Sequence, residues 1–380
     1  MRTAVQRRGA LALCVVLLFC LLAGCTGHSG EKNWSELTPQ STTELKYAKQ
    51  FTIEDYGNGL QLITIAQDRQ YLLVPEGAQI PAGVPEEVTV LQQPIQNIYL
   101  TATAAMDLFR ALDGLDAIRL SGTKESGWYL PEARQAMEAG DILYAGKYSA
   151  PDYELILAQQ CGLAVESTMI YHNPEVKEQL ESLGIPVLVD YSSYESDPLG
   201  RMEWIKLYGA LLGKEEEAAR IFDEEVAAVQ PVLNQTNTGK TVAFFYITNT
   251  GTVNVRKSGD YIAQLIRMAG GVYVPDNQNG DEENALSTMN IDMESFYAAA
   301  HDADVLIYNS TIDGELASLD ELLKKSELLA DFKAVQNGEV WCTGKNMFQS
   351  SMSLGRMILE INAVLTQQAP GGLTYLYRLS

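Results

Sequence analysis

The sequence is poor in histidine, and it has few cysteines outside its first 25 residues. Only three of its 380 residues are histidine, namely His28, His172 and His301. Because a bare Zn²⁺ or Mn²⁺ site usually needs several histidines together with carboxylates, such a site is disfavoured. Beyond residue 25 the only cysteines are Cys161 and Cys342, which lie far apart in the sequence. No disulfide framework is therefore expected.

Catalytic signatures and an excess of basic residues are also missing. The sequence has no glycine-rich phosphate loop and no HExxH, GxSxG or CxxC motif. Two glutamates could suggest a glycosidase, but Glu154 and Glu294, discussed below, are expected on separate halves of the molecule. The formal net charge is −22, which disfavours nucleic acid and anionic lipid as partners. We therefore expect neither an enzyme nor a nucleic-acid-binding protein.

The one long apolar run lies at the N-terminus. A basic start precedes the uncharged stretch from Ala10 to Leu22, which is short for a bilayer span and predicts a secretory signal over residues 1–24. The run ends in Leu-Ala-Gly-Cys25, which resembles the lipobox of bacterial lipoproteins. The alternative is an ordinary secretory signal with a chance cysteine. The resemblance implies that Cys25 is lipidated and holds the protein at the extracytoplasmic face of the cell membrane.

Composition and patterning divide the rest of the chain. Residues 25–45 are rich in Ser, Thr, Gly and Glu and predict a flexible tether after the lipidated cysteine. Residues 46–197 and 236–380 alternate short apolar strands with helices, which predicts an N-terminal and a C-terminal α/β lobe. The first lobe begins with a hairpin whose turn is Gly57-Asn58-Gly59. The predicted fold is therefore α/β, with two Rossmann-like lobes built on central parallel-type sheets.

Residues 198–235 predict a helical bridge between the lobes. One part runs from Pro198 to about Leu212, and a second follows Gly213. In the second part, apolar residues recur at steps of three and four from Ala218 to Val229, as expected for one buried helix face. The many acidic residues between them are interpreted as a solvated face.

Two segments repeat the same pattern, one in each predicted lobe. Asp152-Tyr153-Glu154 and Asp292-Met293-Glu294 each precede a helix and then a strand, and the two segments align without a gap. Each aspartate is placed to cap a helix, and each glutamate falls in the first turn, near the positive end of the helix dipole. Ordinary helix-start chemistry explains either glutamate alone, but the gap-free echo favours a shared role.

Taken in order, several strings resemble the class III substrate-binding proteins of ABC importers, which serve iron–siderophores, haem and cobalamin. The resemblance covers about Phe51 to Gln367. The strings that carry it, besides the lipobox, are SAPDYELILAQQCGLAV, LGIPVLVDYSSYESDPLGRMEWIKLYGALLGKEEEA, RKSGDYIAQLIRMAGGVYV and NIDMESFYAAAHDADVLIYNS.

This resemblance implies two lobes joined by one long backbone helix, with ligand in the cleft between them. It also implies that Glu154 and Glu294 dock on an ABC permease, which works with its ATPase. Exposed ion pairs contribute little affinity, so these glutamates would set register and orientation. The protein is expected to be a monomer without a bound cofactor, and its small-molecule ligand is expected to be a metal chelate.

Ligand contacts are expected on loops that leave the C-terminal ends of the strands. These loops are rich in aromatic and cationic residues, which suit a large flat or amphipathic ligand. The predicted contacts are Trp128, Lys147, Tyr148, Tyr171, His172, Tyr194, Glu195, Arg256, Lys257, Trp341 and Phe348, and the same loops carry Ser121, Thr123, Lys124, Tyr191, Asn346 and Gln349. Arg256 and Lys257 stand out because arginine can grip carboxylate or catecholate-like oxygens.

The ligand class remains open between three chelates. A ferric siderophore is preferred, and a corrinoid or haem is the alternative. Tyr171-His172 could supply a haem axial ligand, although a loop aromatic and a capping histidine ahead of Pro174 are the preferred interpretation. A solute-sensing domain for a membrane receptor would use the same fold.

Overall fold

The computed structural model describes residues 33–276, 288–369 and 372–380, which form two compact units. The predicted signal peptide, Cys25 and His28 lie outside these residues. The smaller unit contains residues 33–38 and 78–86, and the larger one residues 39–77 and 87–380. Within the described ranges, no helix has both the length and the apolarity needed to cross a bilayer.

The smaller unit is built on one short helical turn. The 3₁₀ helix η1 (Trp34–Glu36) is capped by Asn33, whose side-chain oxygen accepts from the backbone N–H of Ser35 at 3.1 Å. Asn33 also forms a parallel bridge with Ala82, which joins the two segments of this unit.

The larger unit begins with a five-stranded sheet in the order β1-β2-β3-β4-β5. Its strands are β1 (Ser41–Thr42), β2 (Phe51–Gly57), β3 (Leu60–Ile65), β4 (Arg69–Val74) and β5 (Thr89–Gln92). The predicted hairpin is confirmed: β2 and β3 are antiparallel, and both Asn58 (φ 54°) and Gly59 (φ 78°) adopt the left-handed conformation that this tight turn needs. Part of the predicted tether differs, because β1 pairs with β2 instead of remaining free.

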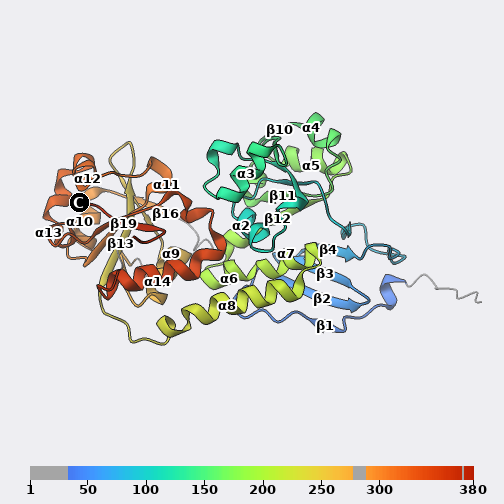
Figure 1. Cartoon of the computed structure of the whole chain (residues 1–380), viewed down its shortest axis with the longest axis horizontal. Helices are drawn as coiled ribbons and strands as arrows, with labels where there is room; N and C mark the ends of the chain where they lie inside the picture. Colours follow the sequence, from blue (N-terminus) through green and yellow to red (C-terminus); the bar gives the residue numbers. More distant parts are fainter. Residues whose placement is uncertain (1–32, 277–287, 370–371) are drawn as a thin grey trace, which may run out of the picture. The chain divides into compact units, whose positions relative to one another are not determined.

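The N-terminal lobe contains a five-stranded sheet in the order β12-β11-β6-β7-β8, and every pairing in it is parallel, as predicted. Its strands are β6 (Ile98–Leu100), β7 (Ile118–Ser121), β8 (Leu143–Tyr144), β11 (Ala164–Ser167) and β12 (Val187–Asp190). Helices α2 (Ala105–Ala111) and α3 (Pro131–Ala139) pack on one face, and α4 (Tyr153–Ala158) and α5 (Pro174–Ser182) pack on the other (Figure 1). A small hairpin, β9 (Gly146–Lys147) and β10 (Ala150–Pro151), precedes α4.

The predicted bridge consists of three consecutive helices, α6 (Pro198–Glu203), α7 (Ile205–Leu212) and α8 (Glu215–Leu233). The expected break at Gly213 is present, because this residue caps α7 in the left-handed conformation (φ 66°). Helices α7 and α8 then pack very closely, and a Cβ atom added to Gly209 would lie 2.5 Å from that of Ala218. The long helix is thus α8 alone, with 19 residues.

The C-terminal lobe contains a seven-stranded sheet that mixes both pairing directions. The order is β16-β14-β13-β17-β18-β19, with β15 paired to β13. The strands are β13 (Thr241–Ile247), β14 (Val253–Arg256), β15 (Val272–Val274), β16 (Thr288–Ile291), β17 (Val305–Tyr308), β18 (Val340–Thr343) and β19 (Leu376–Arg378). Pairings among β13, β15, β17 and β18 are parallel, whereas β14, β16 and β19 join antiparallel.

Helices cover both faces of this sheet as well. Helices α9 (Tyr261–Met268) and α14 (Leu354–Leu365) pack on one face, and α10 (Met293–Ala300), α12 (Leu319–Lys325) and α13 (Lys333–Gln336) pack on the other (Figure 1). The short helix α11 (Ser310–Asp313) follows β17. One apolar core extends from the N-terminal lobe through α6, α7 and α8 into the face that bears α9 and α14. The two lobes therefore share buried side chains, which favours a stiff connection.

Two buried carboxylates tie the segment Lys46–Gln50 to the start of the bridge. Glu203, at the end of α6, accepts from the backbone N–H groups of residues 46, 47 and 48 at 2.7–2.9 Å. Glu195, ahead of α6, accepts from those of residues 49 and 50 at 2.8–3.0 Å. We call Lys46–Gln50 the anchor segment, because five consecutive N–H groups that no strand partner takes are bound by these acids.

Candidate functional site

The two echoed helix starts have the geometry that the sequence predicts. Asp152 caps α4 by accepting from the N–H of Leu155 at 3.0 Å, and Asp292 caps α10 by accepting from that of Ser295 at 2.7 Å. Glu154 and Glu294 lie in the first turns and are exposed. Each helix leads into a central parallel strand of its lobe, β11 and β17 respectively. Both lobes thus present one solvated carboxylate at an equivalent position.

Three tyrosines gather at the C-terminal ends of β11 and β12. Tyr171 lies in the 3₁₀ helix η4 (Thr168–His172), and Tyr194 ends η5 (Ser192–Tyr194). The ring of Tyr191 lies 6.3 Å from that of Tyr171 and 5.2 Å from that of Tyr194, measured between centroids. The guanidinium of Arg69 lies 5.0 Å from the Tyr171 ring centre and 5.2 Å from that of Tyr191, within the range of cation–π attraction. We call these four residues the tyrosine cluster.

Two arginines, one on the bridge helix α6 and one in the C-terminal lobe, are near enough to interact electrostatically. Arg201 is on α6, with its guanidinium carbon 3.5 Å from the ring centre of Tyr261. Arg256 ends β14, lies 5.4 Å from the ring centre of Phe348, and has its Nη1 3.7 Å from Oδ2 of Asp260. Burial lowers the pKa of Arg201, and Arg256 adds to that effect, whereas Tyr261 and Asp260 oppose it. This arginine pair is therefore a partly desolvated positive site, to which an anionic group would be attracted.

Arg201 joins the arginine pair to the tyrosine cluster. Its Nε donates to the carbonyl of Glu195 at 2.9 Å, and its Nη2 donates to that of Ser193 at 2.5 Å. Because Tyr194 lies between these two carbonyls, Arg201 holds the loop that carries its ring. Arg201 thus links the loop that carries Tyr194 to Arg256, with which it interacts electrostatically.

The remaining predicted residues lie on loops of the two lobes. Lys147 is exposed and Tyr148 half-buried in the β9–β10 hairpin, whereas His172 is exposed at the end of η4 and Lys257 is half-buried after β14. The ammonium group of Lys124 lies 5.5 Å from the ring centre of Tyr144. Asn346 and Gln349 belong to the loop that follows β18.

Three predicted ligand contacts have structural roles instead. Trp128 is only 1% exposed, and its Nε1 donates to Oγ of Ser121, itself buried, at 3.2 Å. Glu195 is 2% exposed, and its carboxylate accepts hydrogen bonds from the anchor segment and, at 3.1 Å, from Nε1 of Trp204. Trp341 is on β18, where its ring lies 5.3 Å from the guanidinium of Arg378 beside a separate cavity of about 240 Å³. Burial leaves Trp128 and Glu195 almost no surface to offer a ligand, and Trp341 lines a cavity whose lining includes none of the other predicted contacts.

Sequence reasoning missed Arg69, Arg201, Asp260 and Tyr261. Arg201 had a local signal, since it is the one cation among the otherwise apolar or acidic residues of α6. Arg69 had none, because its tyrosine partners are about a hundred residues or more away along the chain.

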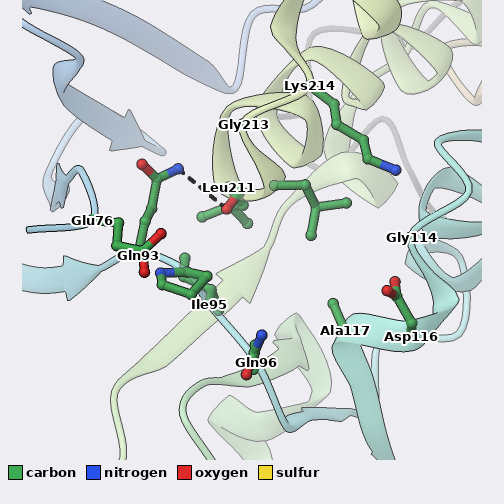
Figure 2. Close-up of a pocket in the computed structure, with 12 residues that line it drawn as sticks. Glu76, Gln93, Ile95, Gln96, Gly114, Asp116, Ala117, Leu211, Gly213 and Lys214 are labelled. Carbon is green, nitrogen blue, oxygen red and sulfur yellow. Dashed lines mark hydrogen bonds between the residues drawn. The ribbon is translucent and has the colours of Figure 1, made fainter.

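One cavity lies at the opposite edge of the N-terminal sheet. It measures about 350 Å³ and is lined by residues just before β6 and β7, such as Gln96 and Ala117, and by the turn from α7 to α8. Figure 2 shows Gln93 reaching the end of α7, where its amide donates to the carbonyl of Leu211 at 3.4 Å. The same amide donates to the carbonyl of Ala210 at 2.9 Å. Since ligand loops in open α/β sheets leave the carboxyl ends of strands, this cavity is not part of the candidate site.

A family model described as periplasmic binding protein matches residues 101–347, which is more than half of the chain. The chain belongs to the periplasmic binding protein family. Members of this family are binding proteins.

Relatives and solved structures agree with this assignment. Two uncharacterized lipoproteins of Methanocaldococcus jannaschii, MJ0878 and MJ0872, are 24% and 22% identical and cover 95% and 87% of this chain, which spans 93% and 88% of them. The haem-binding protein HutB of Vibrio cholerae superposes with a TM-score of 0.58 at 18% identity, covering 72% of this chain and 99% of its own. An Fe³⁺-hydroxamate transport protein of Saccharomonospora viridis gives 0.54 at 21% identity, over 72% and 93%. At these identities the structures show the fold alone.

Proposed function

We propose that this protein is a lipid-anchored, extracytoplasmic solute receptor that captures a ferric siderophore and delivers it to the permease of an ABC importer. The observation that carries the ligand class is the arginine pair, of which Arg201 also binds the loop that carries Tyr194 of the tyrosine cluster. A siderophore complex offers oxygen-rich, often anionic faces on an aromatic or amphipathic body. Guanidinium groups bind such oxygens with directed hydrogen bonds, and tyrosine rings cover the apolar parts.

Arg256 is the residue whose change should weaken ligand binding most cleanly, since Arg201 also supports a loop. Arg256→Gln should weaken the binding of a ferric trihydroxamate or ferric tricatecholate about ten- to hundredfold, the usual loss for a hydrogen bond to a charged group. Arg256→Lys should lose less, because it keeps the charge without the planar fork. Titration followed by tryptophan quenching measures both, with Arg220→Gln on the exposed side of α8 as the control.

The same titration tests the ligand class itself. Haemin or cyanocobalamin binding more tightly than every ferric siderophore would replace the proposed ligand. Failure of all of these chelates to bind the wild-type protein would contradict the proposal of a chelated-metal receptor.

Docking on the permease should depend on both glutamates together. In proteoliposomes holding the importer, Glu154→Lys with Glu294→Lys should reduce receptor-stimulated ATP hydrolysis at least tenfold, because charge reversal turns attraction to basic permease residues into repulsion. Ligand affinity should stay unchanged. The matched control is Glu178→Lys with Glu327→Lys, which changes the net charge equally at exposed positions of the two lobes. Equal activity of the two double variants would contradict the docking role.

A further inference from the structure

Outside the shared core, the two lobes meet through a short series of hydrogen bonds. On the C-terminal side the donors and acceptors belong to residues 349–352, which follow β18 and include the 3₁₀ helix η8 (Ser351–Ser353). The backbone N–H of Met352 donates to Oδ2 of Asp107 at 2.8 Å, and Oγ of Ser351 donates to the carbonyl of Ala104 at 2.8 Å. Both of these contacts reach α2 or the residue just before it.

Gln349 makes the third contact in this series, and it uses both ends of its side-chain amide. Its Oε1 accepts from the backbone N–H of Tyr129 at 2.7 Å, and its Nε2 donates to the carbonyl of Gly127 at 2.8 Å. The side chain therefore pairs with the loop 127–129 as a neighbouring backbone strand would. We call these two hydrogen bonds the Gln349 latch.

Both sides of the Gln349 latch are held rigidly. The buried indole of Trp128 fixes the loop 127–129 to Ser121 at the end of β7. On the other side, the N–H of Gln349 donates to the carbonyl of Asn346 at 3.1 Å, and Oγ of Ser350 donates to the same carbonyl at 3.0 Å. Between flexible loops, two such hydrogen bonds would fix the distance poorly. Because both loops are rigid here, the two bonds hold them at a defined separation.

The latch also adjoins the candidate ligand site. Phe348, which faces the guanidinium of Arg256, immediately precedes Gln349. Any movement of Gln349 away from the loop 127–129 would therefore displace Phe348 and the surroundings of Arg256.

We propose that Gln349 is a positioning residue that holds the two lobes near their ligand-binding separation before any ligand arrives. The role in binding rests on the proposed function, but the effect on lobe separation does not. Without the latch, the lobes sample wider separations, so a smaller fraction of molecules can bind the ligand. The apparent ligand affinity falls in proportion to that fraction.

Lobe separation can be measured without a ligand or a permease. Nitroxide labels attached through ketone-bearing residues at positions 158 and 299, exposed on α4 and α10, leave the native cysteines untouched. Pulsed electron paramagnetic resonance on the full chain in detergent should give a narrow distance distribution for the wild type and a broader or longer one for Gln349→Ala. Gln349→Glu should behave like the alanine variant, because a carboxylate keeps the acceptor for Tyr129 but cannot donate to Gly127. Gln336→Ala, an exposed change on α13, is the control.

Identical distance distributions in the wild type and both Gln349 variants would overturn the proposal. A second measurement uses a ferric trihydroxamate as the probe, for which Gln349→Ala should lower affinity about tenfold without changing the melting temperature beyond that of the control. If the wild type does not bind this probe, the ligand assignment fails, while the distance measurement still decides the role of the latch.

Discussion

Ionisation of Glu166 should lower the free energy of unfolding of the wild type by about 3 kcal/mol between pH 4.5 and pH 8, and Glu166→Gln should abolish this decrease. Glu166 is completely buried on β11. Oγ1 of Thr101 donates to its Oε2, and its Oε1 has no hydrogen-bond partner within the described part of the chain. Burial raises the pKa of this carboxyl from 4.5 to about 7, against a smaller opposing effect of Thr101.

The direction of this effect follows from where the proton resides. Below pH 4.5 the carboxyl is protonated in both states, so it contributes no difference. Between pH 4.5 and 7 the folded protein holds a proton that the unfolded chain releases, so stability falls as the pH rises, and above pH 7 the loss levels off. Glutamine is neutral throughout, so its own fixed cost of burial does not vary with pH.

Urea denaturation from pH 4.5 to 8 measures the difference between wild type and Glu166→Gln at each pH. The gap should grow in favour of the variant as the pH rises. Glu178→Gln, an exposed change on α5, serves as the control and should follow the wild type. Parallel stability curves for wild type and Glu166→Gln would show that Glu166 ionises normally in the folded state.

Removing the carboxylate of Glu203 should destabilise the protein by about 3–5 kcal/mol, the usual cost of breaking one side of a buried ion pair. The Glu203 side chain is fully buried, and its Oε1 lies 2.7 Å from Nζ of Lys206, which is 10% exposed. Glu203→Ala would leave this ammonium without its counter-charge. It would also leave the first three N–H groups of the anchor segment without an acceptor.

Glu203→Gln separates these two effects. The amide keeps one oxygen for the backbone donors but carries no charge. The free energy of unfolding of Glu203→Gln should therefore lie between that of the wild type and that of Glu203→Ala. Glu217→Ala in the first turn of α8 is the control; its side chain is 45% exposed and lies 3.7 Å from Arg220, so the change should cost less than about 1 kcal/mol. Chemical denaturation at pH 7 measures all three. A loss below 1 kcal/mol for Glu203→Ala would contradict the role given to this carboxylate.

Features set by neighbouring residues were predictable from the sequence. The hairpin at Gly57-Asn58-Gly59, the break at Gly213 and the caps by Asp152 and Asp292 each depend on backbone preferences or side chains within a few positions. The parallel N-terminal sheet also followed from its alternating pattern. The three antiparallel strands of the C-terminal sheet did not, because pairing direction depends on connections that local patterning does not encode.

The ligand site was less predictable because burial depends on distant partners. Glu195 looks like any loop acid in the sequence, yet its partners at residues 49 and 50 lie about 145 positions earlier. Trp128 and Trp341 are aromatic residues in or near the expected loops, but tertiary packing turns their rings inward. The contacts that stay predicted include Tyr171, Tyr194, Arg256 and Phe348. Arg201 could be added only from the structure, which shows its contact with Tyr261 of the C-terminal lobe.

The anchor segment has a mechanical consequence. A pull applied ahead of β1 is resisted first by the pairing of β1 with β2 and then by the five N–H groups from Lys46 to Gln50, which Glu203 and Glu195 bind. These acids flank α6, which contacts elements of both lobes. Force applied ahead of β1 would therefore be resisted by the β1–β2 pairing and by the residues next to α6, and not by the hydrogen bonds between the two lobes.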